Sequence, residues 1–254
     1  MRHFNFKEIM IKKISDDNKI GNSPIKICYP GTIWGQKDSG IGTIGRIDQA
    51  NIGAGNTIKM HPHINDEILS YFRSGIVKHT DSEGFSVDIT PNKLMLMKAG
   101  KIFYHEETVN KTIEGLQIFI RPNEKDLKPT VTFLDLPEVY STDQWRLIAS
   151  PTSQTPLQFS SETWIYDFKA ETLVDFILPE FPKSGLTAIL YIFQGFATIN
   201  QEYQLNKGES IVFDDNEIIN IKTHQSTELV LFLTNESSNF YSDGMYSGNQ
   251  SNES

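Results

Sequence analysis

The amino-acid sequence predicts an all-β protein built from two barrel or sandwich domains in tandem. Long amphipathic helical patterns are scarce in its 254 residues, whereas short runs rich in Ile, Val, Phe and Tyr recur between Gly, Pro, Asn and Asp. Many short strands at such spacing are typical of a β-sandwich or barrel. The two halves of the chain also resemble each other, and two copies of one β unit are the simplest explanation.

The expected strands divide between the two halves. The first half contains candidate strands at Glu67–Arg73, Phe85–Ile89, Lys93–Met97, Ile102–Val109 and Glu114–Ile120. The second half contains candidate strands at Trp164–Lys169, Ala188–Phe193, Phe196–Asn200, Glu209–Phe213 and Glu228–Leu233. In each half we expect a strand, a glycine turn and a returning strand, with the turns at Gly75 and Gly195.

We expect two domains followed by a tail. A proline-bearing stretch near Pro129–Pro137 suggests a boundary that gives an N-terminal domain over 1–132 and a C-terminal domain over 133–236. Residues 237–254 are dominated by Asn, Ser, Gly and acidic side chains, with too few apolar residues to pack a unit. The composition favours a mobile tail, and a tail packed across the other domain is the open alternative.

Charge and composition exclude several classes of protein. The net charge of −9 and the lack of a basic stripe argue against direct binding of nucleic acid. No apolar run approaches the roughly 20 residues that span a bilayer, and charges near the N-terminus interrupt any signal peptide. Cys28 is the only cysteine, which rules out an internal disulfide and suits a reducing compartment. We therefore expect a cytoplasmic protein that does not bind a membrane, with Cys28 as a buried inert thiol.

Two short segments carry the residues with the clearest chemistry. The first is Lys59-Met60-His61-Pro62-His63, and the second contains His105 and Glu107 separated by one residue. Because side chains alternate along a strand, His61 and His63 share one face, and His105 and Glu107 share another. If the two strands meet inside a barrel, three imidazoles and one carboxylate converge. A single His-X-His pair can be surface decoration, but two pairs of matching parity among six histidines favour a metal site.

Such a mixed set of nitrogen and oxygen ligands suits a divalent transition metal. The set suits Fe(II), Mn, Co, Ni, Cu or Zn, whereas Ca and Mg prefer all-oxygen sites. Four protein ligands leave one or two coordination positions free. Glu107, as the only carboxylate in the set, is also the candidate general base toward a substrate hydroxyl.

The spacing of these residues resembles that of the pirin family within the cupin superfamily. The resemblance is carried by Gly-X5-His-Pro-His-X3-Glu-X7-Gly, from Gly55 to Gly75, and by Ala-Gly-X4-His-X-Glu, from Ala99 to Glu107. It extends from about residue 42 to residue 233. It implies two cupin (jelly-roll β-barrel) domains in tandem, with one metal in the N-terminal cupin and a C-terminal cupin without metal.

Carried over position by position, the resemblance assigns the metal ligands to His61, His63, His105 and Glu107. Glu67 occupies the carboxylate position that many other cupins use, so it is expected near the metal or as an alternate ligand. The activity implied by bacterial pirins is 2,3-dioxygenation of a flavonol such as quercetin, which opens the ring with loss of carbon monoxide. The alternative is a regulatory protein that binds a protein partner according to its metal or redox state.

Other residues carry weaker expectations. The aromatic side chains that are candidate walls for a flat substrate, or simply barrel filling, are Phe103, Phe119, Tyr104 and Tyr71. Arg46 and Arg121 are candidates for lining the cavity. His79 lies in a polar turn-like stretch and is expected to be solvated. His224 stands alone in the second half and is expected to be structural or exposed rather than a ligand.

Overall fold

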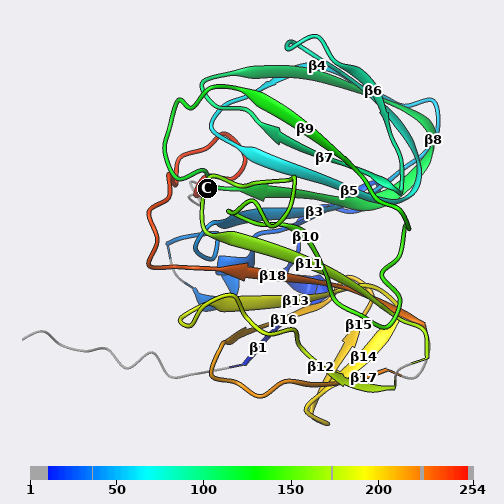
Figure 1. The fold of residues 1–254 in the computed structure, drawn as a ribbon, viewed down its shortest axis with the longest axis vertical. Coiled ribbons are helices and arrows are strands. Elements are labelled where there is room, and N and C mark those ends of the chain that lie inside the picture. The colour runs from blue at the N-terminus through cyan, green and yellow to red at the C-terminus, as the bar shows by residue number, and fades with distance from the viewer. Residues whose placement is uncertain (1–10, 36, 173, 224–225, 251–254) are drawn as a thin grey trace, which may run out of the picture.

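The structure is a computed structural model that describes residues 11–35, 37–172, 174–223 and 226–250. Within these ranges the chain is nearly all β, with three sheets and two short 3-10 helices, η1 (Asp16–Asn18) and η2 (Pro30–Trp34). None of the helices in the described ranges is long and apolar enough to cross a membrane. Figure 1 shows the sheets stacked one above another, with the N-terminal half at the top. The expected all-β fold is confirmed.

The first domain is one strongly bent sheet that closes into a barrel. Its strands run in the order β2-β3-β8-β5-β7-β9, with β4 added to β8 and β6 added to β5. Their bounds are β2 (Ile25–Cys28), β3 (Ile44–Ile52), β4 (Thr57–His63), β5 (Glu67–Asp81), β6 (Ser86–Ile89), β7 (Lys93–Lys98), β8 (Phe103–Ile120) and β9 (Thr130–Asp135). The first half of β5 and the middle of β7 are buried on both faces, whereas the first half of β8 alternates between buried and more exposed residues.

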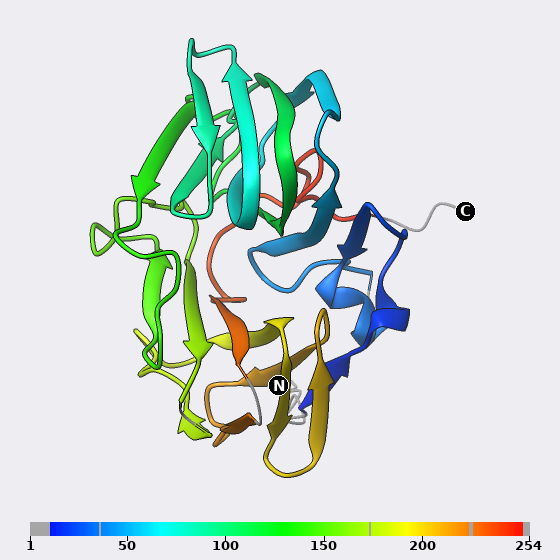
Figure 2. The same ribbon diagram turned by 90° about the vertical axis from the view of Figure 1, so that its right-hand side faces the viewer.

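The second domain packs a six-stranded sheet, β1-β16-β13-β18-β11-β10, with a four-stranded sheet, β12-β17-β14-β15. Its strands are β1 (Lys12–Ile14), β10 (Arg146–Ala149), β11 (Thr163–Ala170), β12 (Asp175–Ile177), β13 (Thr187–Gln194), β14 (Phe196–Ile199), β15 (Tyr203–Asn206), β16 (Ser210–Asp214), β17 (Asn220–Thr223) and β18 (Thr227–Thr234). In Figure 2 the dark blue β1 lies with the yellow and orange strands of this lower domain. The N-terminal strand thus belongs to the C-terminal domain.

Several expected strand limits were wrong because long strands bend instead of turning back. The segments 102–109 and 114–120 form the single strand β8, and Gly75 lies inside β5 rather than in a hairpin turn. Gly75 has a φ of +84°, and the pairing of β5 with β8 shifts register between Phe72 and Val77. Gly195, with a φ of +90°, separates β13 from β14, which belong to different sheets. Both glycines therefore bend the chain where the sheet bends or changes.

The expected domain limit between residues 132 and 133 falls inside β9, which pairs with β7 over its whole length. We propose a limit in the connection between β9 and β10, with β1 assigned to the second domain. His224 lies outside the described residues.

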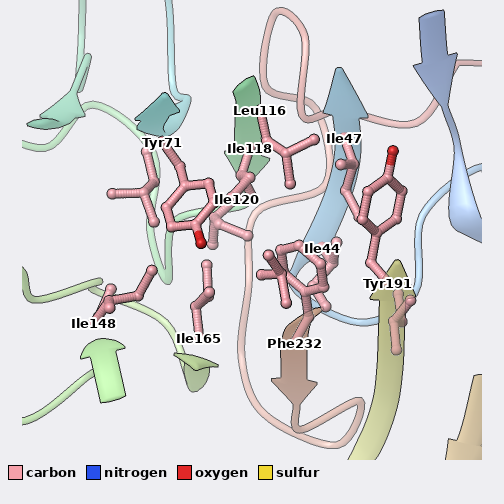
Figure 3. Packing of buried hydrophobic residues seen from close by; sticks show 14 of the residues in the cluster. Ile44, Ile47, Tyr71, Leu116, Ile118, Ile120, Ile148, Ile165, Tyr191 and Phe232 are labelled. Carbon is pink, nitrogen blue, oxygen red and sulfur yellow. The ribbon is translucent and has the colours of Figure 1, made fainter. Parts of the chain in front are cut away.

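The largest hydrophobic core lies between the two domains. It combines buried side chains of the eight-stranded and the six-stranded sheets, and Figure 3 shows Ile118 and Ile120 of β8 near Ile165 of β11 and Phe232 of β18. Cys28 is also buried in this cluster, and burial raises the pKa of its thiol to about 12. Because sheets packed face to face share one core, each domain depends on the other for burial of its inner face.

A buried ionic network also joins the domains. Asp167 of β11 is fully buried and accepts hydrogen bonds from Arg73 of β5 at 2.6 Å and from Arg146 of β10 at 2.6 and 2.9 Å. The Tyr71 hydroxyl donates to the same carboxylate at 3.3 Å. One carboxylate therefore bridges the buried guanidinium group of Arg73 and the partly buried group of Arg146.

The C-terminal segment differs from the expectation of a mobile tail. After β18, the chain leaves the second domain and runs to the first, as the red segment of Figure 1 shows. Ser247 is fully buried, and the backbone N–H of Tyr241 donates to the carbonyl of Pro122 at 2.8 Å. Residues 237–250 thus follow the alternative arrangement, because backbone hydrogen bonds fix a segment with few apolar side chains. Residues 251–254 lie outside the described residues.

Replacement of Asp167 by Asn is expected to destabilise the protein by about 3 to 5 kcal/mol, because the buried guanidinium group of Arg73 loses its nearest counter-charge. Urea unfolding monitored by circular dichroism measures this change. Asp175→Asn, at an exposed position of β12, is the matched control and should change the free energy of unfolding by less than about 0.5 kcal/mol. Equal stability of the two variants would contradict the structural role of Asp167.

Candidate metal centre

The pairing of β4 with β8 brings the predicted histidines together. His61 lies opposite His105, Pro62 opposite Tyr104 and His63 opposite Phe103. The inward face of β8 carries Phe103, His105 and Glu107 in alternation, and all three are buried. His63 and His105 are only 4% and 2% exposed, whereas His61 is half-buried. The site therefore lies within the barrel wall and reaches solvent on the side of His61.

A bulge in β4 turns the histidines inward. Ile58 pairs with Glu107 and His61 pairs with His105, so two residues of β4 stand against one residue of β8. Without this extra residue, alternation from Ile58 would direct Met60 inward and His61 outward. Met60 is instead 49% exposed. The register shift thus places both His61 and His63 on the same side as His105.

The three imidazoles point their Nε2 atoms at one another. The Nε2 atoms of His63 and His61 are 3.1 Å apart, and those of His63 and His105 are 3.0 Å apart. Ligand nitrogens around a tetrahedral divalent metal, each about 2.0–2.1 Å from it, lie roughly 3.3 Å apart. The donor set therefore has the separation that a small transition-metal ion requires.

The Nδ1 atoms of His61 and His105 form hydrogen bonds that leave their Nε2 atoms available to a metal. His61 Nδ1 lies 2.8 Å from the carbonyl oxygen of Lys59, to which it donates its proton. His79 Nε2 lies 2.8 Å from Asp81 Oδ2, and its Nδ1 lies 3.4 Å from His105 Nδ1. With His79 donating to Asp81, His79 Nδ1 accepts the proton of His105. His61 and His105 then both direct an unprotonated Nε2 at the common point, as ligand histidines do.

Burial favours the neutral form of His61 and His105. It lowers the pKa of His105 to about 2, with the neighbouring histidines His63, His61 and His79 adding to the effect. Burial also lowers the pKa of His61, against the hydrogen bond to the Lys59 carbonyl, which raises it. Because a metal binds the unprotonated ring, these groups are ready to bind at neutral pH.

His79 was expected to be solvated and is instead fully buried. It lies on the inward face of β5 opposite Glu107, and Asp81 lies opposite His105. Burial lowers the pKa of His79, and the Asp81 carboxylate opposes that shift. The spacing of His79 and Asp81, two residues apart after the apolar run of β5, was the signal that could have identified them. The polar neighbours of His79 in sequence belong to the outward face of the same strand.

Glu107 lies beside the three histidines but faces other partners. Gln117 Nε2 donates to both carboxylate oxygens, at 2.9 and 3.1 Å. The ligand atoms of Glu107, His79 and His105 lie within 4.8 Å of one another, as do those of His61, His63 and His105. Burial raises the pKa of Glu107 to about 7, although the Gln117 amide partly opposes the shift. His105 is thus common to both groups.

Glu67 lies apart from these groups. Its buried carboxylate accepts the backbone N–H of Ser160 in the second domain, at 2.9 and 3.2 Å, and Lys98 Nζ is 3.9 Å away. Burial raises the pKa of Glu67, and Lys98 opposes that shift. Its position makes it a contact between the domains.

Two of the four aromatic side chains expected to line the site lie beside the histidines, and two lie elsewhere. Phe119 packs with its ring centre 6.2 Å from that of His63, and Phe103 lies 6.4 Å from His105. Tyr104 is 42% exposed on the outer face of β8, and Tyr71 points into the core between the domains, as Figure 3 shows. Of the four aromatic residues predicted from the sequence, Phe103 and Phe119 therefore flank the histidines, and Tyr71 and Tyr104 do not.

The two arginines also differ in their surroundings. Arg46 stacks on Phe119, with 5.0 Å from Cζ to the ring centre, and pairs with Asp48 at the edge of the site. Arg121 is fully buried and bonds Asp38 and the carbonyls of Gly42 and Ser247, which makes it structural.

Known proteins resemble this chain in sequence. Residues 37–120 match the family model described as Pirin. The quercetin 2,3-dioxygenase of Escherichia coli K12 is 27% identical over 188 residues, which cover 71% of this chain and 78% of that protein.

Solved structures extend the likeness to both domains. The bacterial pirin YhhW from Escherichia coli, in complex with nickel(II), superposes with a TM-score of 0.74 at 19% identity, over 89% of this chain and 99% of that one. A quercetin 2,3-dioxygenase from Acinetobacter baumannii superposes with a TM-score of 0.73 at 22% identity, over 91% of this chain and 80% of that one. The fold is therefore the two-domain β fold of these structures, and the sequence resemblance to the Pirin family model extends over residues 37–120.

Proposed function

We propose that the first domain binds one divalent transition metal through His61, His63 and His105, with Glu107 as the fourth ligand. The observation that carries this proposal is the convergence of the three Nε2 atoms at 3.0–3.1 Å. With all three Nε2 atoms unprotonated, their lone pairs would repel one another unless a cation lay between them. Fe(II) is our favoured metal, and nickel in a pirin of the same fold supports the same class of ion.

We further propose that the protein is a dioxygenase that opens a flavonol such as quercetin. The bound metal would supply Lewis-acid activation of a substrate hydroxyl and the redox chemistry that oxygenation needs. Glu107 would take the proton of that hydroxyl when it loosens from the metal, because a free carboxylate beside the substrate can act as general base. Phe103 and Phe119 would exclude water around the histidines. The names of the related enzymes support this substrate class.

The access side of the site constrains how a substrate binds. The cavity beside Glu107 and Gln117 has a volume of about 20 Å³, whereas sites for drug-sized ligands have roughly 300–1,000 Å³. A flavonol would therefore approach from the half-exposed side of His61, with only its reacting edge near the metal. Opening of the surrounding segments would be needed for deeper entry.

The small volume of the cavity beside Glu107 and Gln117 favours a second candidate function. A metal held in a closed wall, next to a cavity of about 20 Å³, also suits a regulatory protein that contacts a protein partner. In this role the metal state would alter the outer surface of β4, and no turnover would take place.

His105→Ala is expected to abolish stoichiometric metal binding and to leave the β fold intact, because His105 faces both His63 and His79. Metal content after metal-free refolding and reloading, with circular dichroism for the fold, is the measurement. Glu67→Gln is the control and should keep the metal, while Glu107→Gln should weaken binding. Full occupancy in His105→Ala would refute the ligand assignment, and the reverse order of the two Glu variants would assign the carboxylate ligand to Glu67.

Glu107→Gln is expected to stabilise the metal-free protein at high pH. The raised pKa means that the folded state retains a proton between pH 4.5 and about 7, so its stability falls as pH rises through this window. The shift corresponds to roughly 3 kcal/mol. Urea unfolding of the metal-free proteins should show a variant more stable by up to about 3 kcal/mol at pH 8 and little changed at pH 4. Parallel pH profiles would contradict the buried, uncompensated carboxyl.

Oxygen uptake tests the proposed activity. The protein reloaded separately with Fe(II), Mn, Co, Ni and Cu should consume oxygen in the presence of quercetin with at least one metal, in step with flavonol loss. The His105→Ala variant should be inactive with every metal. No uptake by the fully loaded wild-type protein would favour the regulatory function.

A further inference from the structure

The C-terminal segment 243–250, called the strap here, crosses the first domain next to the candidate ligands. The backbone N–H of Met245 donates to the carbonyl of Ile64 at 2.8 Å, directly after the His-Pro-His segment. The strap is also held from the other side, since Ser39 Oγ accepts the N–H of Gln250 at 2.9 Å. It therefore spans from the end of β4 to the loop before β3.

The strap supplies the hydrogen-bond donors of a buried carboxylate. Asp66 is fully buried, and its Oδ1 accepts the backbone N–H of Ser247 at 2.8 Å. The N–H of Tyr246 lies 3.1 Å from both oxygens of the same carboxylate. Because a buried carboxylate without donors is costly, these two N–H groups keep Asp66 in place.

Asp66 in turn faces a candidate metal ligand. Its Oδ2 lies 3.5 Å from His63 Nδ1, and this buried nitrogen has no hydrogen-bond partner among the described residues. His63 Nε2 points at His61 and His105 on the other side of the ring. Asp66 is thus the acceptor placed to receive a hydrogen bond from His63 Nδ1–H, which would leave Nε2 as the unprotonated nitrogen, the role that carboxylates play behind ligand histidines.

Tyr246 adds a second contact from the strap. Its ring centre lies 5.1 Å from that of His63 and 5.8 Å from that of Phe119, and Arg46 Cζ lies 5.3 Å from the same ring. The strap therefore contacts the His63 ring directly through Tyr246 and reaches its Nδ1 edge through Asp66.

We propose that the strap is part of the metal centre and that Asp66 is a positioning residue for His63. The N–H groups of Tyr246 and Ser247 hold Asp66, which sets the tautomer and direction of the His63 ring. This inference rests on the proposed metal binding by His61, His63 and His105. A strap that only covers the barrel would contribute to stability and leave the metal ligands unaffected.

Gly244→Ala separates the strap from Asp66 with a single methyl group. A Cβ at Gly244 would lie 2.3 Å from Ser247 Oγ, 2.5 Å from the Asn65 carbonyl oxygen and 2.8 Å from Asp66 Oδ1. The second variant, Asp66→Asn, keeps the shape of the side chain and removes its charge. Gly53→Ala is the matched control, because a Cβ there meets only Asn56 Nδ2, at 3.6 Å.

The affinity for Co(II), measured by competition with a chromophoric chelator, is the first readout on the full-length variants. The visible absorption spectrum of the Co(II) complex is the second, because it reports ligand geometry directly. We expect Gly244→Ala and Asp66→Asn to weaken binding about 10- to 100-fold and to change the spectrum. Gly53→Ala should match the wild-type protein in both readouts.

Wild-type affinity and spectrum in folded Gly244→Ala would overturn the role of the strap, even if Asp66→Asn is weakened. Unchanged Co(II) binding by Asp66→Asn would overturn the role of Asp66. If Gly244→Ala fails to fold, the result for Asp66→Asn decides whether the proposal stands. Absence of Co(II) binding by the wild-type protein is a separate result, which would refute the proposed metal binding itself. None of these readouts requires turnover of a flavonol.

Discussion

The register between β4 and β8 is the constraint on which the candidate centre depends. In a strand, a shift of one residue exchanges the inner and outer faces, so the single extra residue between Ile58 and His61 decides which side chains enter the barrel. Pro62 at the middle of the segment cannot donate to a ladder, which suits β4 as a strand paired only with β8. The histidines converge because the bulge turns them inward, and Pro62 is tolerated at this edge position of the sheet.

The surroundings of the histidines orient their rings. Each of the three rings has its Nδ1 edge next to an oxygen-bearing or imidazole neighbour: the carbonyl of Lys59, the carboxylate of Asp66 or the ring of His79. The second domain stabilises this arrangement from a distance, through the shared core and through Asp167 and the Ser160 N–H that binds Glu67. Its residues thus help to hold the first barrel closed.

Strand alternation and residue spacing were sufficient to predict the fold class and the convergence of His61, His63 and His105. They were insufficient where the structure depends on contacts between distant segments. His79 appeared to belong to a polar turn, because only the pairing of β5 with β8 reveals that it faces Glu107. The position of Glu67 depends on Ser160, which is 93 residues away along the chain. The composition of the C-terminal segment indicated disorder, since its packing relies on backbone N–H groups that composition does not reveal.

The long separation between Asp66 and its donors has a consequence for biosynthesis. Tyr246 and Ser247 follow Asp66 by 180 and 181 residues, at the end of the chain. Because chains are made at about 5–20 residues per second, Asp66 leaves the ribosome several seconds before Tyr246 and Ser247. During that interval its carboxylate lacks both backbone donors, so the contact between Asp66 and the strap forms only after the second domain has been synthesised.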